Sequence, residues 1–360
     1  PAWQLGYQGV LPLSDNSFIG IHGPVDNRKL AKVDLVSKEV LDFDSEFTYI
    51  APTFVTDGKK IAAFAASNST FPTLVRFDNL KISQTIRENP LPIPSSYAPE
   101  IKEISIPGNG RDVKVILHRA HNPEFKITGA GPVMIRVHGG PTAHKFATAE
   151  IDYLYWTTRG FTIADVNYGG SSGYGAKYRH LLYGNWGIVD YEDVLSTVDH
   201  LIKSGVANPK QVFISGGSAG GFTVLNALVH SNIFAAGADY YGVAELTALA
   251  EDTHDFESRY LDSMIGPYPE KADLYRERSP LTHADKLSAP LIIFQGTEDK
   301  IVPPSQSEMF RDVCIKKGIT YKYFAFAGEG HGFYGSDAII TSLEEELKFF
   351  GQAGGFTPVP

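Results

Sequence analysis

Residues 212–221 read Val-Phe-Ile-Ser-Gly-Gly-Ser-Ala-Gly-Gly, and they join an apolar strand pattern to a helical one. The apolar run at 212–215 favours a strand, and the apolar side chains of 219–230 recur as they do in a helix. Between them lies Gly-x-Ser-x-Gly, which puts Ser218 on a tight strand-to-helix turn. A Cβ at either flanking glycine would clash with neighbouring elements. The pattern predicts that Ser218 is a nucleophile at the carboxyl end of a strand.

The same alternation of strands and helices extends over most of the chain. Strands are predicted at residues 113–117, 132–137, 162–166, 212–215, 235–239, 291–294 and 321–325, and helices at 191–203, 219–230, 305–317 and 338–350. Apolar strands that alternate with helices are typical of a mostly parallel sheet covered on both faces. We therefore predict the α/β class, with an α/β-hydrolase fold over residues 93–360.

The first ninety or so residues show short β-type runs separated by turns instead. Strands are predicted at 17–21, 29–34, 38–41, 49–54, 60–67 and 73–78. This pattern resembles two blades of a β-propeller at about 40–45 residues per blade, with a small β-sandwich as the alternative. Residues 88–100 contain four prolines and predict a linker, so we assign residues 1–92 to the propeller fragment. Closing a propeller takes at least about four blades, so the fragment is a remnant or the other blades lie on a separate chain.

A serine hydroxyl is a weak nucleophile and needs a base that a carboxylate orients. In this fold the acid follows the serine along the chain and the histidine follows the acid. Asp299 comes just after the predicted strand at 291–294, with Glu298 as its competitor. His331 lies between two glycines in the loop after the last predicted strand, and it alone among the eleven histidines combines that loop with the required order. We predict a catalytic triad of Ser218, Asp299 and His331.

The oxyanion of a tetrahedral intermediate needs N–H donors. One expected donor is the backbone N–H of Ala219, which follows the nucleophile. The other should come from the loop after an earlier strand, where residues 138–141 read His-Gly-Gly-Pro. Because glycines allow the backbone to approach a substrate closely, we assign this donor to Gly140, with Gly139 as the alternative.

Composition narrows the classes of partner and cofactor. The net charge of −9 offers no basic face for phosphate backbones, so we expect no nucleic acid partner. The single cysteine, Cys314, cannot form an intrachain disulfide, and we expect a buried thiol and a cytoplasmic protein. No apolar window reaches the about 18 residues of a transmembrane helix, so we expect no membrane partner. Neither a metal-ligand set nor a nucleotide loop is evident, so we expect no metal and no cofactor.

Several motifs occur in the order found in one known family. They are His-Gly-Gly-Pro at 138–141, Asn-Tyr-Gly-Gly-Ser-Ser-Gly-Tyr-Gly at 167–175, Asn-Trp-Gly at 185–187 with Asp190, Gly-Gly-Ser-Ala-Gly-Gly at 216–221, Gly-Thr-Glu-Asp at 296–299 and Gly-His-Gly at 330–332. Together they resemble the prolyl oligopeptidase family of serine peptidases, above all its acylaminoacyl-peptidase and dipeptidyl-aminopeptidase-like branch. Residues 252–260 also resemble a segment of its aminopeptidase-like members.

The resemblance implies that Ser218, Asp299 and His331 form the triad. It also implies that the first segment is the carboxyl-terminal part of a propeller, which caps the site and restricts substrates to short peptides. The prolyl and dipeptidyl branches place a tyrosine hydroxyl in the oxyanion hole where this chain has His138, so we expect a backbone amide to serve there. Some acylaminoacyl members carry an arginine where this chain has Ile301, which argues against a strict acylaminoacyl-peptidase.

These features predict a serine peptidase of the aminopeptidase or oligopeptidase type, which cleaves short peptides or acyl-peptides through an acyl-enzyme on Ser218. A carboxylesterase or specialised amidase that uses the same triad is the main alternative, because a fold alone does not fix a substrate. A non-catalytic binding protein is a second alternative, against which the complete triad argues. Besides the substrate, the expected partners are a chain with the missing blades and a second copy of this chain in a homo-oligomer.

Overall fold

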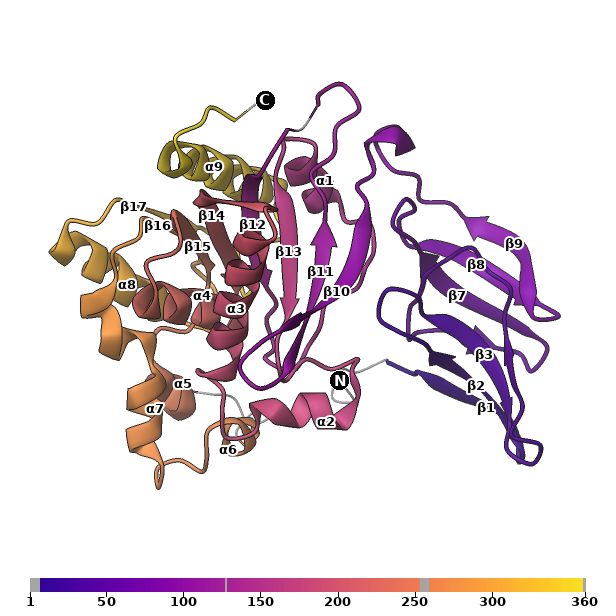
Figure 1. The fold of residues 1–360 in the computed structure, drawn as a ribbon. Coiled ribbons are helices and arrows are strands. Elements are labelled where there is room, and N and C mark those ends of the chain that lie inside the picture. The colour runs from indigo at the N-terminus through magenta and orange to yellow at the C-terminus, as the bar shows by residue number, and fades with distance from the viewer. Residues whose placement is uncertain (1–6, 127, 253–258, 359–360) are drawn as a thin grey trace. The chain divides into compact units, whose positions relative to one another are not determined.

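The computed structural model describes residues 7–126, 128–252 and 259–358. The chain divides into two compact units (Figure 1). The first unit comprises residues 1–103, 116–126 and 146–158, and the second comprises 104–115, 127–145 and 159–360. The boundary between residues 92 and 93 stays a prediction.

Two antiparallel sheets make up most of the first unit. One runs in the order β1 (Val10–Ser14), β2 (Ser17–His22), β3 (Lys29–Asp34) and β4 (Val40–Asp42). The other runs in the order β5 (Tyr49–Ile50), β7 (Lys60–Ala66), β8 (Thr73–Asp78) and β9 (Lys81–Arg87), with β6 (Val55–Thr56) paired to β7. The prediction of an all-β segment built like propeller blades is confirmed.

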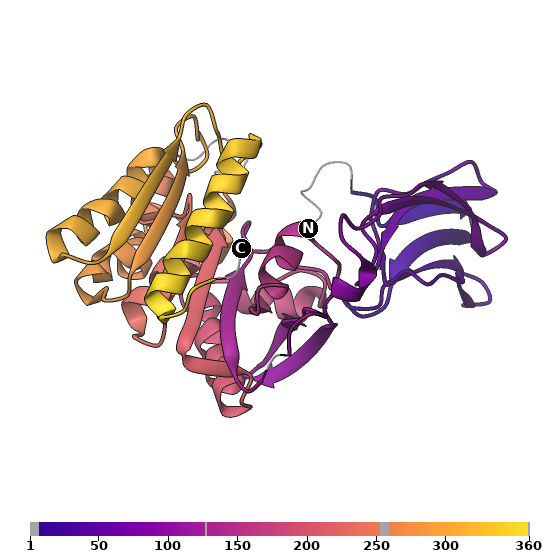
Figure 2. The same ribbon diagram turned by 90° about the horizontal axis from the view of Figure 1, so that it is seen from above.

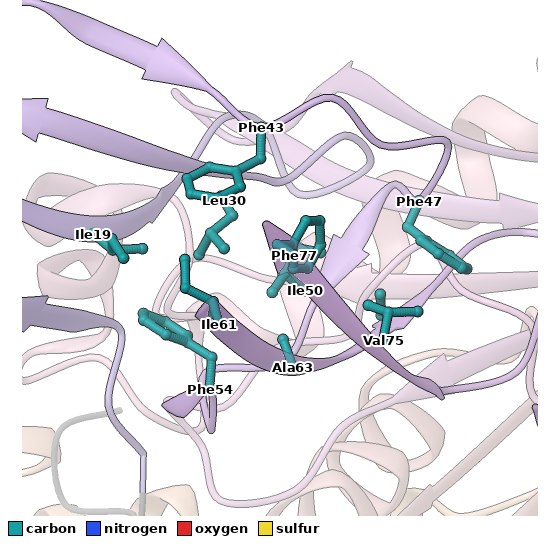
Figure 3. Packing of buried hydrophobic residues seen from close by; sticks show 11 residues of the cluster. Ile19, Leu30, Phe43, Phe47, Ile50, Phe54, Ile61, Ala63, Val75 and Phe77 are labelled. Carbon is teal, nitrogen blue, oxygen red and sulfur yellow. The ribbon is translucent and has the colours of Figure 1, made fainter. Parts of the chain in front are cut away.

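The two sheets of the first unit share one apolar core (Figure 3). Ile19 and Leu30 come from the first sheet, whereas Ile61 and Phe77 come from the second. The Phe43 ring meets the Phe77 ring edge to face, with 5.5 Å between the ring centroids. Alternate residues of β8 are buried, as expected of a strand with one face on a core.

Two of the predicted strands lose two or more residues at one end in the structure, and each has a local cause. The strand predicted at 38–41 begins only at Val40, because the Asp34 carboxylate accepts hydrogen bonds from the Val36 and Ser37 amides and holds a turn. The strand predicted at 49–54 ends at Ile50, and Pro52, which has no N–H to donate to a sheet, follows shortly after.

An eight-stranded sheet is the framework of the second unit. Its strands follow the order β10 (Ile101–Pro107), β11 (Asp112–His118), β13 (Thr162–Asn167), β12 (Gly131–Val137), β14 (Ala207–Gly217), β15 (Ala236–Tyr240), β16 (Leu291–Gly296) and β17 (Tyr321–Phe326). The pairs from β13 and β12 through to β17 are all parallel. The predicted mostly parallel α/β-hydrolase sheet is confirmed. Because β12, β14, β15 and β16 are neighbours, the loops after them meet at one edge.

Helices cover both faces of this sheet, and α8 and α9 lie on opposite faces (Figure 2). The helices are α1 (Ile151–Thr157), α2 (Gly175–Arg179), α3 (Val189–Lys203), α4 (Ala219–His230), α5 (Leu246–Asp252), α6 (Tyr260–Met264), α7 (Ala272–Arg278), α8 (Pro304–Lys317) and α9 (Ser336–Gly354), with 3-10 turns at Ser95–Tyr97, His180–Leu182 and Pro280–Lys286. The four predicted helices are present as α3, α4, α8 and α9. Every residue of α4 except His230 is buried, so this central helix is fixed by packing.

Cys314 on α8 is buried, as predicted, and burial raises the pKa of its thiol to about 11. Within the described part of the chain, no helix combines the length and apolar character needed to cross a bilayer.

Candidate active site

Ser218 occupies a strained turn at the junction of β14 and α4. Its backbone has φ 58° and ψ −125°, a combination that side-chain-bearing residues rarely adopt. Two hydrogen bonds hold the turn: the Ser218 N–H donates to the Tyr240 carbonyl, and the Phe222 N–H donates to the Ser218 carbonyl. The strain therefore lies at the predicted nucleophile, and neighbouring backbone fixes it.

Two glycines beside Ser218 allow β14, α4 and β12 to approach one another. A Cβ on Gly216 would lie 2.8 Å from the Gly220 carbonyl oxygen. A Cβ on Gly220 would lie 2.2 Å from the Val137 carbonyl oxygen, at the end of β12. Cβ atoms essentially never make contacts this short, so packing requires the glycines at both positions of the Gly-x-Ser-x-Gly motif.

The three predicted triad residues lie in one hydrogen-bonded chain. His331 Nε2 is 2.9 Å from Ser218 Oγ, and His331 Nδ1 is 2.8 Å from Asp299 Oδ2. A carboxylate only accepts hydrogen bonds, so Nδ1 carries the proton and donates it. Nε2 is then the acceptor for the Ser218 hydroxyl. This is the arrangement in which an imidazole can take the serine proton.

The Asp299 carboxylate is buried but well supplied with donors. Its Oδ1 accepts from the Ile301 and Val302 amides at 2.9 Å each, and its Oδ2 accepts from the Gln295 side-chain amide at 3.3 Å. Burial raises the pKa of Asp299, but the hydrogen bonds from His331 and the Val302 amide outweigh that effect and hold the pKa below its usual value. The carboxylate therefore stays ionised at neutral pH.

Backbone contacts join the Asp299 loop to the His331 loop. The Glu298 N–H donates to the Glu329 carbonyl, and a Cβ on Gly296 would lie 2.4 Å from that same oxygen. The Glu298 side chain is exposed, whereas Asp299 is buried against His331. Of the two acids that compete in the sequence, the structure brings Asp299 to the histidine.

The loop predicted to supply an oxyanion donor borders Ser218 through Gly139. Gly139 lies against the serine, because a Cβ built on it would be 3.3 Å from Ser218 Cβ and 3.0 Å from the Gly217 carbonyl oxygen. Among the described residues, the N–H groups of Gly139, Gly140 and Ala219 have no hydrogen-bond acceptor. These N–H groups are therefore available to a substrate oxygen, and their role in an oxyanion hole stays a prediction.

Sequence reasoning missed other side chains around the triad. The Tyr241 ring lies against the His331 ring, with centroids 4.8 Å apart, and a Cβ on Gly217 would touch it. Tyr241 has φ 42°, so it is a second strained residue beside the first. Gln295, whose oxygen accepts from the Ser307 hydroxyl at 2.7 Å, braces Asp299. Each follows or ends a predicted strand at the triad edge, and that placement is the signal that points to it.

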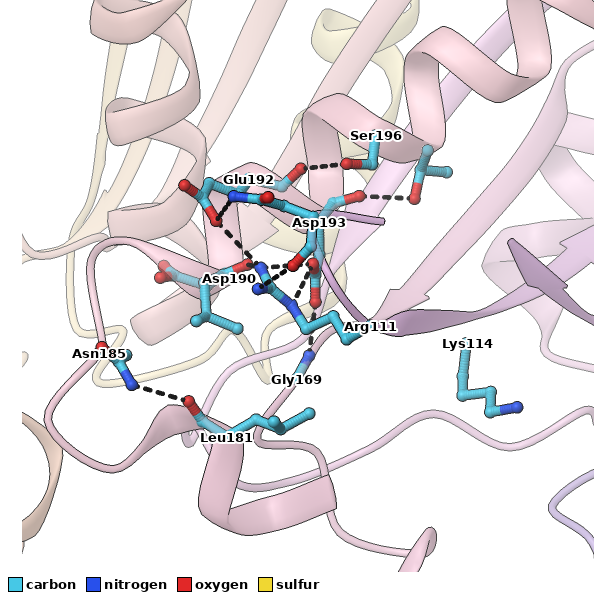
Figure 4. Close-up of polar contacts among 12 residues, drawn as sticks. Arg111, Lys114, Gly169, Leu181, Asn185, Asp190, Glu192, Asp193 and Ser196 are labelled. Atoms are coloured by element: carbon cyan, nitrogen blue, oxygen red, sulfur yellow. Dashed lines mark hydrogen bonds and ion pairs between the residues drawn. The ribbon is translucent and has the colours of Figure 1, made fainter. Parts of the chain in front are cut away.

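A buried ion cluster holds a loop next to this site (Figure 4). The Arg111 Nη2 is 2.7 Å from Asp193 Oδ1, and it also pairs with Glu192 at 3.2 Å. The other oxygen of the Asp193 carboxylate accepts from the Gly169 amide at 2.7 Å. Asp193 on α3 is fully buried, so this carboxylate ties a helix, a strand end and the loop that begins at Gly169 together.

Replacing Arg111 with Met is expected to destabilise the chain by about 3–5 kcal/mol, because it leaves the buried Asp193 carboxylate without its cation. Adding Asp193→Asn should recover much of this loss, since an asparagine oxygen can still accept from Gly169. Urea unfolding gives the free energies of unfolding. The control is Lys203→Met, which breaks an exposed pair with Asp199 and should cost about 0–1 kcal/mol. An Arg111→Met loss no larger than that of the control would show that the cluster does not stabilise the fold.

Asp239, at the end of β15, is a second buried carboxyl close to the nucleophile turn. Among the described residues, neither of its oxygens has a hydrogen-bond partner in good geometry, although the Gly242 amide lies close by, and a Cβ on Gly221 would lie 2.3 Å from its Oδ1. Burial raises the pKa of Asp239 to about 7, against a smaller opposing effect of the Gly242 amide. The folded protein therefore binds a proton here between about pH 4 and 7 that the unfolded chain releases.

Folded-state stability should accordingly fall as pH rises from about 4 to 7 and stay lower above that range. Asp239→Asn removes this penalty, so the stability advantage of the variant over the wild type should grow by about 2–3 kcal/mol between pH 5 and pH 8. Urea unfolding of both proteins at the two pH values measures the difference. An equal difference at pH 5 and pH 8 would mean that Asp239 does not titrate in this range.

Within the described residues, no group of three or more His, Cys, Asp or Glu side chains is placed to hold a metal ion. The segment at 252–260 that resembles aminopeptidase-like members lies mostly outside the described residues, because 253–258 are not among them.

Comparisons with known proteins agree with this geometry. The model of the family described as "Prolyl oligopeptidase family" matches residues 147–356. A solved structure of a puromycin-hydrolysing peptidase from Mycobacterium tuberculosis is 36% identical in sequence, and its superposition covers 100% of this chain with a TM-score of 0.94. Dipeptidyl aminopeptidase BIII of Pseudoxanthomonas mexicana is 32% identical over 219 residues, or 59% of this chain. Acylamino-acid-releasing enzyme 1 of Oryza sativa subsp. japonica is 28% identical over 218 residues, or 58% of this chain.

All of these proteins are longer than the matched part. The chain spans 55% of the Mycobacterium tuberculosis peptidase. The matched parts of the two curated relatives are 32% and 28% of their lengths.

Proposed function

Because this chain belongs to the prolyl oligopeptidase family, we propose that it is a serine peptidase that cleaves short peptides through an acyl-enzyme on Ser218. The observation that carries this proposal is the hydrogen-bonded chain from Ser218 through His331 to Asp299, at the strained turn before α4. A strained, partly buried serine with an aligned base is the arrangement that acyl transfer uses.

In the proposed mechanism His331 acts in each half-reaction first as a base and then as an acid. His331 Nε2 accepts the Ser218 proton as Oγ attacks the carbonyl carbon, and Asp299 stabilises the imidazolium that forms. The N–H groups of Ala219 and Gly140 donate to the oxyanion, and one such donor is worth about 3–4 kcal/mol of transition-state stabilisation. His331 then protonates the leaving amine. In the second half, His331 takes a proton from water as the water oxygen attacks the acyl carbon, and it returns a proton to Ser218 Oγ as the bond between that carbon and Oγ breaks.

We propose that peptides with a free amino terminus are better substrates than acylated ones. Ile301 supports this choice, because it stands where some acylaminoacyl members carry an arginine. Puromycin is a second candidate substrate, on the 36% identity to a peptidase named for hydrolysing it. Further propeller blades, on this polypeptide or a separate chain, would restrict access to short substrates. That cap, a homo-oligomer and a cytoplasmic location stay predictions.

A substrate panel tests this proposal. The full chain is assayed with aminoacyl and dipeptidyl p-nitroanilides, their N-acetylated forms, puromycin and p-nitrophenyl esters of the same acyl groups. The proposal predicts turnover of the anilides with a free amino group, at a higher kcat/KM than the acetylated forms. Turnover of the esters alone would contradict a peptidase and favour the carboxylesterase alternative. Intact-mass analysis of the native sample shows whether a second chain accompanies this one.

A further inference from the structure

His138 lies at the end of β12, immediately before the glycines that border Ser218. Its ring is buried and stacks on the Tyr168 ring, with centroids 4.5 Å apart and an interplanar angle of 14°. Its Nδ1 is 3.0 Å from the Gly139 carbonyl oxygen, and its Nε2 is 2.7 Å from the Ser171 hydroxyl. Both ring nitrogens are therefore engaged, and neither reaches the triad.

These contacts fix which nitrogen of His138 carries a proton. Burial lowers the pKa of His138 to about 4, although the hydrogen bond to Gly139 opposes the shift, so the ring is neutral at pH 7. A neutral imidazole has one N–H, and the Gly139 carbonyl oxygen can only accept. Nδ1 therefore donates to Gly139, and Nε2 accepts from the Ser171 hydroxyl.

The hydrogen bond to Gly139 orients the peptide group that follows it. In a trans peptide the C=O and the next N–H lie in one rigid plane and point in opposite directions. When His138 holds the Gly139 carbonyl, the Gly140 N–H faces away from the imidazole. Gly140 has φ 49°, and its own carbonyl accepts from the Ala143 amide at 2.6 Å, so the backbone on its far side is fixed as well.

The loop that contacts His138 is itself anchored. Asp193, held by Arg111, accepts from the Gly169 amide between Tyr168 and Ser171 (Figure 4). The Ser172 amide donates to the carbonyls of Thr142 and Ala143, at 3.2 and 3.0 Å. Residues 168–172 are thus buried and anchored, and their contacts hold residues 138–143 in place.

We propose that His138 is a positioning residue that aims the Gly140 N–H at the oxyanion, with Ser171 setting its tautomer. This inference rests on the proposed function, since it concerns the transition state of that reaction. It assigns the first residue of the His-Gly-Gly-Pro motif a role in catalysis without contact to the substrate.

Two substitutions at His138 separate its hydrogen bond from its volume. His138→Leu keeps a bulky side chain but removes the donor to Gly139, and kcat should fall by about 10²-fold with KM little changed, as for the loss of one oxyanion donor. In His138→Asn the side-chain amide nitrogen takes a place similar to that of Nδ1, and most of the lost kcat should return. The inhibition constant of a peptidyl trifluoromethyl ketone, which forms a tetrahedral adduct, should rise in parallel with the fall in kcat.

Ser171→Ala and Ser172→Ala form the matched control pair. Both remove a hydroxyl from the same loop, but the Ser172 hydroxyl contacts His144 rather than His138. Ser171→Ala should lower kcat without changing KM, whereas Ser172→Ala should leave kcat near the wild-type value.

A loss in His138→Leu that appears in KM alone, or a His138→Asn variant as slow as His138→Leu, overturns the inference. A wild type that hydrolyses no substrate of the panel overturns the proposed function and this inference together, whereas an active wild type with an equally active His138→Leu overturns the inference alone.

Discussion

Replacing Ser218 with alanine is expected to lower kcat for peptide and ester substrates by about 10⁶-fold, the loss seen when a triad nucleophile is removed. Alanine retains the Cβ and so fits the same strained backbone, which Tyr240 and Phe222 hold through hydrogen bonds. The fold should therefore persist, with an unfolding transition like that of the wild type. Substrate affinity should also persist, because the oxyanion donors and the pocket are unchanged.

A matched control for this variant lies on the same strand. Ser215 is buried in β14, three residues before the nucleophile, and Ser215→Ala makes the same chemical change outside the hydrogen-bonded chain. It should retain activity. Kinetic assays of both variants, with circular dichroism as a check on folding, measure the difference. Peptidase activity in Ser218→Ala at the level of Ser215→Ala would refute the assignment of the nucleophile.

Asp299→Asn is expected to lower kcat by about 10⁴-fold with little change in KM. The asparagine oxygen can still accept from the Ile301 and Val302 amides, so the loop should keep its geometry. Its NH₂ group, however, would face His331 Nδ1 as a donor, and the imidazole would have to place its proton on Nε2. Nε2 could then no longer accept the Ser218 proton.

Glu298→Gln is the control for this second variant. Glu298 is adjacent in sequence and loses the same charge, but its side chain is exposed rather than buried against His331. Its kcat should stay near the wild-type value. Because the pKa of Asp299 is held below its usual value, its ionisation should not limit the wild-type rate between about pH 6 and 9. Equal losses of kcat in both variants would mean that kcat depends on the negative charge of the loop and not on the hydrogen bond between Asp299 and His331.

Local patterns predicted the elements that have a clear period and a buried face. The helix predicted at 219–230 coincides with α4, and the strands predicted at 29–34 and 73–78 coincide with β3 and β8. β9 was missed because nearly all of its residues are exposed, so no apolar alternation marks it. The short helices α2, α5, α6 and α7 were missed because five to seven residues contain too few turns to establish a helical period.

The triad could be proposed from sequence because chain order and loop type constrain it strongly. Ser218, Asp299 and His331 each follow a strand of one parallel sheet, and parallel strands bring such loops to one edge. The contacts that position the predicted oxyanion loop could not be predicted from the sequence, because those of His138 with Tyr168 and Ser171 join segments about thirty residues apart. Only the pairing of β12 beside β13 brings those segments together.

The most direct test of the account is to treat the full chain with a fluorophosphonate and locate the adduct by peptide mapping. A fluorophosphonate reacts with a serine hydroxyl that an adjacent base activates, so it reports the nucleophile without requiring knowledge of the natural substrate. We expect one stoichiometric adduct, on Ser218, that is absent from Ser218→Ala and forms much more slowly in Asp299→Asn. An adduct on a different residue, or a wild type that remains unlabelled, would contradict it.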